Sequence, residues 1–386
     1  MKIVHIANFY GSTSGGIKTT IHELGRGYQR YGHEFIYVVP GPKFMQEQTP
    51  FGTRISLPSR TLPFTGGYQV IKSNRQLLTL LEFLKPDRIE VSDRFTLIKV
   101  GKWAKRMKIS TLVFSHETLA GLARRFFPFV PKFIRDRFVN RQNRKLAKSF
   151  DKVVVTTKFA GDEFVRINTP NLHKISLGVD LAGFNPEFKS YKLKKELVKS
   201  SDYLMIYSGR LSPEKEPMRV LEALRNLLDR GIKVRLVVLG GGAMWNKFRA
   251  VAKELPVEMV GYVASREKIA NYLSCADVAV APGPLETFCL SALESLASGV
   301  PVVASASSAV GEILNSSGIE KAGLVAENNG DAFADAIAQI INDNSFQKNA
   351  RKRAEQFAWS NTISQMLELH DAKPAMVTVR RRLKVA

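Results

Sequence analysis

Two glutamates flank an apolar run in the second half of the chain. Glu286 and Glu294 enclose the residues TFCLSAL, with Glu294 eight positions after Glu286. Eight positions are just over two helical turns of about 3.6 residues, so a helical run would place both carboxylates on roughly one side. Glu286 itself falls between a predicted strand end and a helix start, and Glu294 falls inside that helix. A buried carboxylate is costly unless it accepts hydrogen bonds, and the hydroxyl pairs of a sugar or a ribose are suitable donors. The spacing predicts that one acid binds a sugar and the other a ribose. The alternative is that Glu286 only caps a helix N-terminus.

A pair of cations follows another apolar run. Arg210 and Lys215 lie in SGRLSPEKE, directly after the run YLMIYS. A forked guanidinium together with an ammonium group matches the oxygens of a diphosphate. The pair therefore predicts a diphosphate site. The alternative is a solvated basic turn whose cations pair with Glu214 or Glu216.

Two glycine-rich segments could bring backbone N–H groups close to a ligand. Gly15 and Gly16 lie in GSTSGGIKTT, ahead of a helical pattern whose dipole favours an anion, although a flexible loop is the alternative. The segment fits neither a P-loop nor G-x-G-x-x-G, which argues against a P-loop enzyme and a standard dinucleotide site. Gly240 and Gly241 follow a further apolar run in LGGG, where the turn suits the edge of a base or a ribose.

These candidates must be held by elements that alternate between strand and helix patterns. Helical patterns such as 21–32, 74–85 and 218–231 separate the apolar runs, and residues 42–73 read as irregular. Strands are predicted at 2–7, 34–41, 88–92, 110–117 and 152–157, then at 203–211, 233–242, 257–263, 278–282 and 301–305. Such alternation implies parallel sheets with right-handed crossovers. Two series separated near residue 186 predict an α/β protein of two doubly wound, Rossmann-like domains, with ligands beyond the carboxyl ends of the strands.

Composition limits the class of protein. A chain of 386 residues with 45% hydrophobic and 24% charged residues predicts a soluble protein of two domains. Cys275 and Cys289 provide no disulfide framework and no metal-ligand spacing, which fits a reducing cytoplasm. We expect neither a signal peptide nor a transmembrane helix, because no apolar run approaches about 18 residues.

Positive charge is concentrated in the first half of the chain and in its tail. The formal net charge is +22, and residues 1–190 carry 31 Lys and Arg against 14 Asp and Glu. Residues 121–150 alone contain nine Lys and Arg, one acid and six Phe. Cations interleaved with aromatic rings suit an anionic membrane surface. The alternatives are that the Phe side chains pack in the domain core, or that the charge binds nucleic acid. Because no nucleic-acid module is recognisable, we expect no nucleic-acid partner.

In this order, several segments resemble those of the retaining, nucleotide-sugar-dependent glycosyltransferases of the GT-B fold, in the group 1 (glycogen-synthase-like) family. They are SGGIKTTIHELGRGYQRYGHE, LGVDLAGFNP, YSGRLSPEK, VVLGGG and ETFCLSALESLASGVPVVAS. Within this family, the chain is most similar to the actinobacterial phosphatidylinositol mannoside α-mannosyltransferases. The segments that carry this similarity are HIANFYGSTSGGIKTTIHELGRGY, DRIEVSDRFTL and VFSHETL. The resemblance implies an acceptor-binding domain at 1–185 and a nucleotide-sugar-binding domain at 186–357. A helix crossing back to the first domain and a basic tail would follow at 358–386.

The resemblance also implies roles for particular residues. Arg210 and Lys215 would neutralise the departing diphosphate, Glu286 would bind the transferred sugar, and His116, in VFSHE, would face the reaction centre as a further catalytic residue. Glu294 would bind the ribose. The remaining predicted donor contacts are Gly15, Gly16, Gly240, Gly241, Phe288, Cys289 and Leu290.

Two residues depart from the family pattern, which has glycine where this chain has Cys289 and, in some cases, Glu216. The resemblance implies no enzymic nucleophile, because the reaction occurs on the face from which the phosphate leaves. No metal is expected, since VSDR at 91–94 has an Asp without the Asp-x-Asp pair of metal-dependent transferases.

The expected function is transfer of a hexose, mannose from GDP-mannose, to a lipid-linked or glycan acceptor at the inner face of the cell membrane. The alternatives are a UDP-sugar transferase or epimerase of the same fold, and a basic nucleic-acid-binding protein.

Overall fold

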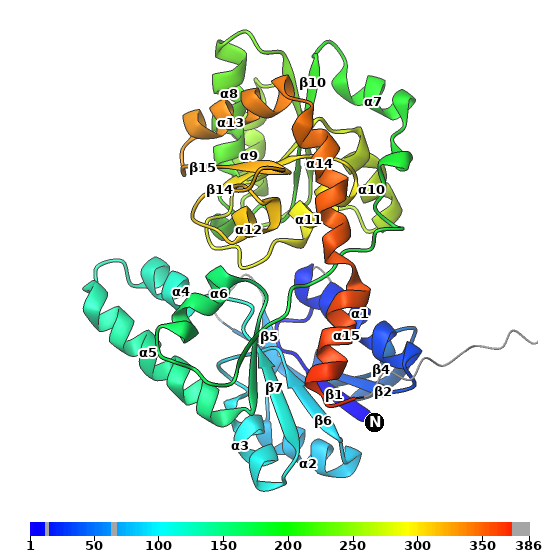
Figure 1. Ribbon diagram of the computed structural model, residues 1–386, viewed down its shortest axis with the longest axis vertical. Helices are drawn as coiled ribbons and strands as arrows, with labels where there is room; N and C mark the ends of the chain where they lie inside the picture. Colours follow the sequence, from blue (N-terminus) through cyan, green and yellow to red (C-terminus); the bar gives the residue numbers. More distant parts are fainter. Residues whose placement is uncertain (12–14, 63–67, 373–386) are drawn as a thin grey trace, which may run out of the picture.

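The computed structural model describes residues 1–11, 15–62 and 68–372, so the basic tail predicted at 373–386 lies outside the described residues. The described residues form two α/β domains, one above the other in Figure 1. Each is built on a sheet whose central strands are parallel. This confirms the predicted α/β architecture of two parallel-sheet domains.

Among the described residues, the first sheet has nine strands in the order β3-β4-β2-β1-β6-β7-β8-β9, with β5 paired to β4. The strands are β1 (Lys2–Ile6), β2 (Glu34–Gly41), β3 (Met45–Thr49), β4 (Gly52–Thr61), β5 (Gln69–Ile71), β6 (Arg88–Val91), β7 (Ser110–Phe114), β8 (Lys152–Val155) and β9 (Leu172–Lys174). The helices are α1 (Gly16–Arg30), α2 (Asn74–Leu84), α3 (Ile98–Arg106), α4 (Leu119–Phe126), α5 (Lys132–Ser149) and α6 (Lys158–Val165).

Both faces of this sheet are covered, which explains its continuous apolar strands. Successive side chains of a strand point to opposite faces. In β1, Ile3 joins the core cluster that contains Leu24 of α1, whereas Val4 joins the cluster that contains Leu77 of α2. A parallel strand buried on both faces reads as an unbroken apolar run, so these strands could be predicted from the sequence.

The prediction that residues 42–73 are irregular was wrong. They contain β3 and β4, which pair antiparallel, and β5, while β4 also runs parallel to β2. Strand β3 (MQEQT) is an exposed edge, and β4 buries Ile55 and Leu57 between polar neighbours. Neither segment has the apolar run that identified the central strands.

The second sheet has six strands among the described residues, in the order β12-β11-β10-β13-β14-β15. They are β10 (Tyr203–Ser208), β11 (Val234–Leu239), β12 (Val257–Gly261), β13 (Val278–Ala281), β14 (Val302–Ser305) and β15 (Gly323–Ala326). The helices are α7 (Tyr191–Val198), α8 (Met218–Asp229), α9 (Trp245–Ala252), α10 (Arg266–Cys275), α11 (Leu290–Ala297), α12 (Val310–Leu314), α13 (Gly330–Asn342) and α14 (Ser345–Ala354). Short 3₁₀ turns lie at Pro186–Phe188, Pro213–Lys215 and Glu355–Phe357.

The last described helix returns to the first domain. After α14 the chain runs down beside α1 as α15 (Trp359–Leu369), drawn in orange-red in Figure 1. A Cβ on Gly27 of α1 would overlap Ile363, so the two helices approach closely because position 27 is glycine. Arg88 donates a hydrogen bond of 3.0 Å to the carbonyl of His370, which anchors the end of α15 beside β6.

Candidate active site

Glu286 lies in the loop between β13 and α11, not on the helix. Helix α11 begins at Leu290 after Cys289, and its N-terminus has no side-chain cap. This confirms the predicted position of Glu286 between a strand end and a helix start, with Glu294 inside that helix. The two acids do not share one helical side, and the alternative of a capping role was wrong. The Glu286 side chain is 14% exposed, and its carboxylate forms an ion pair with the ammonium group of Lys215.

Lys215 and Arg210 approach this loop from the segment after β10. Burial alone would lower the pKa of Lys215, but the Glu286 carboxylate raises it above its usual value, so the ammonium stays charged. The Arg210 guanidinium lies 3.8 Å from Glu214 and 5.3 Å from the ring centre of Tyr68 in the first domain. Because the Arg210 side chain is 43% exposed, its charge is available to an anion between the domains. The solvated-turn alternative therefore holds only for the Arg210–Glu214 contact.

Glu216 does not place a free negative charge beside these cations. Its carboxylate pairs with Arg219, which also donates to the carbonyl of Pro282 over 2.8 Å. Glu216 has a φ of +44° and Cys289 a φ of +73°, both in the left-handed region. For a residue with a Cβ this conformation costs about 1–2 kcal/mol, which explains why glycine suits both positions.

Cys289 carries a neutral thiol at the end of the loop between β13 and α11, which we call the acidic loop because it contains Glu286. Burial and the nearby Glu286 carboxylate raise the pKa of its thiol to about 11. Phe288, just before it, is 4% exposed and packs edge-on against Phe357 with ring centres 6.2 Å apart. The Phe288 side chain therefore belongs to the core, and a donor contact at this position would come from its backbone.

Glu294 lies on α11, apart from the Lys215–Glu286 pair. One carboxylate oxygen is 3.5 Å from the guanidinium of Arg266, at the start of α10. Burial raises the pKa of Glu294 to about 7, and Arg266 only partly offsets that effect. Glu294 therefore changes its charge near neutral pH, and any ligand that needs its carboxylate binds in a pH-dependent way.

The predicted glycines lie at turns where the two domains approach one another or where strands end. Gly15 precedes α1, and a Cβ on Gly16 would be 3.8 Å from Leu290, so the N-terminus of α1 lies close to the start of α11. Gly240 has a φ of +133°, and a Cβ there would overlap the carbonyl of Gly209. A Cβ on Gly241 would enter open space, so its backbone is accessible to a ligand.

His116 lies in the first domain at the end of a buried chain of polar side chains. Its Nε2 is 2.9 Å from the hydroxyl of Ser92, which is 2.9 Å from Nε2 of His5. Nδ1 of His5 is 2.6 Å from the Glu90 carboxylate. His370, at the end of α15, reaches the other oxygen of Glu90 over 2.7 Å. Sequence reasoning missed this chain, because no local pattern marks His5, Glu90 or His370 as neighbours.

His116 is neutral at physiological pH. Burial, with a smaller contribution from His5, lowers the pKa of His116 to about 4. Burial alone would raise the pKa of Glu90, but the hydrogen bonds from His370 and His5 lower it to about 2. A charged carboxylate thus holds the far end of the chain, while the histidine at the near end carries no charge.

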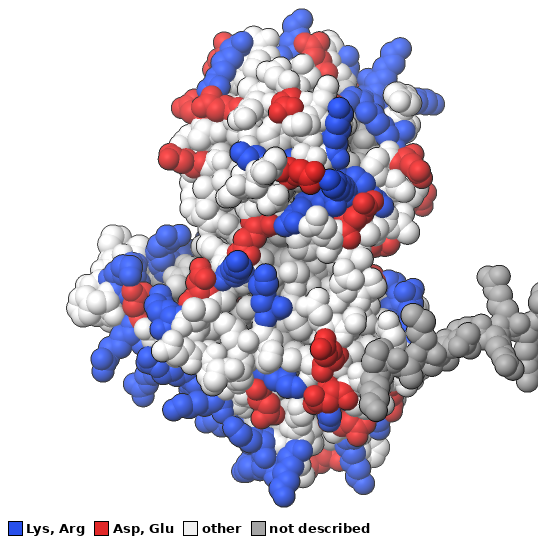
Figure 2. Space-filling view, viewed as in Figure 1, with Lys and Arg blue, Asp and Glu red and all other residues white. Residues whose placement is uncertain are grey.

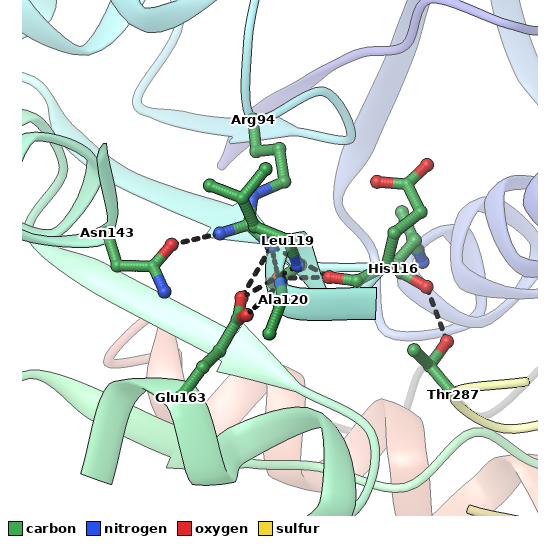
Figure 3. Close-up of polar contacts among 9 residues, drawn as sticks. Arg94, His116, Leu119, Ala120, Asn143, Glu163 and Thr287 are labelled. Atoms are coloured by element: carbon green, nitrogen blue, oxygen red, sulfur yellow. Dashed lines mark hydrogen bonds and ion pairs between the residues drawn. The ribbon is translucent and has the colours of Figure 1, made fainter. Parts of the chain in front are cut away.

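A second buried cluster fixes the segment that carries His116 (Figure 3). Arg94 donates to Glu163 over 2.8 Å, to the carbonyl of Glu117 over 2.7 Å and to the side chain of Asn143. Glu163 also accepts the backbone N–H of Ala120 over 3.0 Å at the start of α4. Arg94 and Glu163 are each 4% exposed, so their pairing sets the path of the chain from His116 to α4.

The second domain contacts this segment directly. The hydroxyl of Thr287, next to Glu286, donates to the carbonyl of His116 (Figure 3). Thr157 donates to the carbonyl of Thr287 over 2.9 Å. Glu312 accepts the backbone N–H of Phe159 over 2.7 Å at the start of α6. The loop that carries Glu286 and the segment that carries His116 are therefore held side by side, and Lys215 is paired with Glu286.

Comparison with known structures first defines the class of protein. The chain superposes on a sucrose-phosphate synthase from Thermosynechococcus elongatus with a TM-score of 0.75 at 20% identity, over 96% of this chain and 98% of that one. Anabaena HepE, solved with UDP and glucose, gives 0.73 at 15% identity, over 96% and 99%. These neighbours are glycosyltransferases of the GT-B fold, and the predicted GT-B architecture is confirmed.

The sequence comparisons then give the family. A model described as Glycosyl transferases group 1 matches residues 189–357, and one described as Glycosyltransferase Family 4 matches residues 14–182. The chain is 38% identical, over 95% of both chains, to a "GDP-mannose-dependent alpha-(1-6)-phosphatidylinositol dimannoside mannosyltransferase" of Mycobacterium tuberculosis. A "GDP-mannose-dependent alpha-mannosyltransferase" of Mycolicibacterium smegmatis is 25% identical over 79% of both chains. The chain belongs to the group 1 glycosyltransferase family, as its sequence segments predicted.

Proposed function

We propose that this chain transfers mannose from GDP-mannose to a phosphatidylinositol mannoside with retention of configuration. The observation that carries the proposal is the 38% identity over 95% of both chains with the relative whose name states this reaction. The site provides support, because two cations, an acidic loop and two helix N-termini meet where the domains contact each other.

In this proposal Arg210 and Lys215 act on the leaving group, and Glu286 acts on the sugar. As the bond from the sugar to the diphosphate breaks, positive charge grows on the sugar and negative charge on the diphosphate. Arg210 and Lys215 lie ready to stabilise the diphosphate. Glu286 accepts sugar hydroxyls, and the acceptor hydroxyl gives its proton to the departing phosphate. Because the two cations supply the charge that a metal would otherwise provide, we propose that transfer is independent of metal.

A panel of donors and acceptors tests the proposal. Purified protein is mixed with GDP-mannose, UDP-glucose or UDP-N-acetylglucosamine, with and without vesicles that contain a phosphatidylinositol mannoside. Of the three donors, we expect only GDP-mannose to stabilise the protein. With the vesicles present it should yield mannosylated lipid, equally with or without EDTA. Turnover of UDP-glucose in its place would contradict the mannosyl assignment. Binding of DNA without binding of any donor would favour the nucleic-acid alternative.

Donor binding is expected to depend on pH through Glu294. The pKa of Glu294 is raised to about 7, so its carboxylate is protonated at pH 6 and charged at pH 8. Ribose hydroxyls donate to the charged form, and the diphosphate of GDP-mannose does not titrate in this range. The Kd for GDP-mannose should therefore fall about tenfold from pH 6 to pH 8.

Calorimetry at pH 6, 7 and 8 measures this dependence. Glu294→Gln should abolish it, whereas Glu254→Gln, at an exposed position, should retain it. His116 does not contribute in this range, because its pKa is lowered to about 4. A Glu294→Gln variant with an unchanged pH profile would show that Glu294 does not bind the ribose.

We further propose that the segment 121–150 binds an anionic membrane surface. Five of its six Phe side chains point outward: Phe126, Phe127, Phe129, Phe133 and Phe138 are 65%, 58%, 98%, 72% and 50% exposed. Only Phe150 lies in the core, so the core-packing alternative fails for this segment. Figure 2 shows Lys and Arg side chains along the lower-left edge, where Figure 1 places α5. Among the described residues, no helix is both long and apolar enough to cross a bilayer.

Removing two of these rings should release the protein from membranes. Phe129→Ser with Phe133→Ser is expected to weaken binding to phosphatidylinositol vesicles at least about tenfold, because both rings would leave the bilayer interface. Vesicle flotation measures the effect. The matched control is Phe83→Ser, since Phe83 is 80% exposed on α2, outside the segment. Equal losses in both variants, or none in either, would contradict the membrane assignment.

A further inference from the structure

A cavity of about 740 Å³ lies where α4, α5 and α6 meet the second domain. Leu285 and Ser307 of the second domain line one side of it. Figure 1 shows the three helices beside one another, below the loops of the second domain. Its volume is within the range of small-molecule sites, roughly 300–1,000 Å³. None of the donor-site residues discussed above lines this cavity, so a donor would leave it vacant.

The lining of the cavity carries both cations and carboxylates. The charged residues of the lining are Arg124, Lys132, Arg135 and Arg166 together with Asp136, Asp162 and Glu163. Guanidinium groups suit phosphate oxygens, and carboxylates suit the hydroxyls of a polyol. A phosphorylated polyol therefore matches this lining better than an apolar ligand or a simple anion.

The cations of the cavity are only partly engaged. Arg124 has no hydrogen bond or ion pair within the described part of the chain and is exposed. Arg166 makes one hydrogen bond of 3.1 Å to Asn140, which leaves further donors of its guanidinium unused. Glu163, also in the lining, is already bound by Arg94 over 2.8 Å and by the N-terminus of α4. Its negative charge is thus offset. Asp136, a further acid of the lining, is paired with Lys132 over 2.6 Å. Arg124, Arg135 and Arg166 remain against Asp162, so the cavity is left with cations in excess.

The position of the cavity connects the exposed Phe side chains to the reaction centre. Phe126 and Phe127 follow Arg124 at the end of α4, and Phe133 follows Lys132 on α5. On the inner side, Thr118 lies two residues after His116, and Leu285 directly precedes Glu286. A headgroup in the cavity would therefore have its acyl chains near the Phe side chains and its hydroxyls near the reaction centre.

We propose that this cavity binds the phosphodiester-linked polyol headgroup of the acceptor lipid. Arg124 and Arg166 bind the phosphodiester, and Asp162 accepts polyol hydroxyls. The inference rests on the proposed function, because it names the part of the acceptor that the enzyme recognises.

Binding of a water-soluble headgroup tests the proposal without a membrane. The probes are glycerophosphoinositol, myo-inositol and inorganic phosphate, and GDP-mannose reports separately on the donor site. The variant is Arg124→Gln with Arg166→Gln. The control is Arg125→Gln with Arg137→Gln, which removes the same charge at exposed positions outside the cavity. Should the double variant fail to fold, Arg124→Gln alone removes a side chain without a partner in the described structure.

We expect the cavity variant to raise the Kd for glycerophosphoinositol about tenfold or more, since charge-assisted hydrogen bonds are lost. Its Kd for GDP-mannose should match that of the control. An equal loss in the control pair would overturn the proposal, because the effect would then come from the general positive charge. Inorganic phosphate that binds as tightly as glycerophosphoinositol would overturn the headgroup assignment.

The same measurements separate the cavity from the reaction. If the headgroup binds through the cavity while no GDP-mannose binds or turns over, the proposed function fails and the cavity assignment stands. If mannose is transferred to lipid with an acceptor KM that the cavity variant leaves unchanged, the cavity assignment fails and the proposed function stands.

Discussion

Replacing Lys215 with alanine is expected to lower kcat about 10²–10³-fold, which corresponds to about 2.7–4 kcal/mol of transition-state stabilisation. Lys215 is the cation held against Glu286, and its pKa is raised, so it is charged throughout the physiological range. Its removal withdraws a positive charge from the departing diphosphate. It also leaves the Glu286 carboxylate without its counter-ion. Single-turnover kinetics with saturating GDP-mannose isolates the chemical step.

Two further variants decide what the loss means. Lys247→Ala, at an exposed position of the same domain, should leave kcat unchanged. Lys215→Arg keeps the charge and should recover part of the rate. If Lys215→Ala raises KM with kcat intact, Lys215 only binds the donor and does not stabilise the transition state.

Replacing Arg94 with methionine is expected to lower the free energy of unfolding by about 3–5 kcal/mol, because it leaves a buried carboxylate without its partner. Arg94 and Glu163 are each 4% exposed, and Arg94 also holds the carbonyl of Glu117 and the side chain of Asn143. The same change loosens the segment that carries His116, so activity should fall even below the unfolding temperature. Urea denaturation followed by circular dichroism gives the stability.

A double-mutant cycle attributes the loss to the pair. Glu163→Gln retains an oxygen for the N–H of Ala120 but removes the charge. Arg94→Met combined with Glu163→Gln should cost clearly less than the two single losses added together. Arg225→Met, at an exposed position of α8, should stay within about 0.5 kcal/mol of the unaltered protein. Additive losses would show that Arg94 acts through packing and not through Glu163.

Local sequence determined where the main strands lie along the chain and that Arg210 and Lys215 follow one of them. Strand β2 was predicted at 34–41 and lies at Glu34–Gly41, because a strand buried on both faces needs an unbroken apolar run. Strand β10 is also an unbroken apolar run, so its end could be located from the sequence. Arg210 and Lys215 could be singled out because they follow that end. Strands β3 and β4 could not be predicted in this way. Strand β3 is an exposed edge, and β4 has partly exposed residues on either side of its buried middle, so neither needs such a run.

The tertiary structure alone decided which side chains meet. Lys215 binds Glu286 and not the nearer acids in sequence, because the loops after β10 and β13 adjoin at one edge of the sheet. Composition could not decide the direction of the Phe side chains either. Helix α5 buries Val139 and Leu146, which leaves Phe133 and Phe138 on its exposed side.

A hydrogen-bonded series of side chains links the first domain's central strands to the returning helix. It runs from His116 through Ser92, His5 and Glu90 to His370. Helical and strand patterns repeat over a few residues, whereas these contacts span up to 280 positions. The sequence by itself determined the GT-B architecture and the family, and it singled out most of the candidate residues. The pairing of those residues, the cavity and the outward Phe side chains depend on how the sheets and helices stack, which no local pattern records.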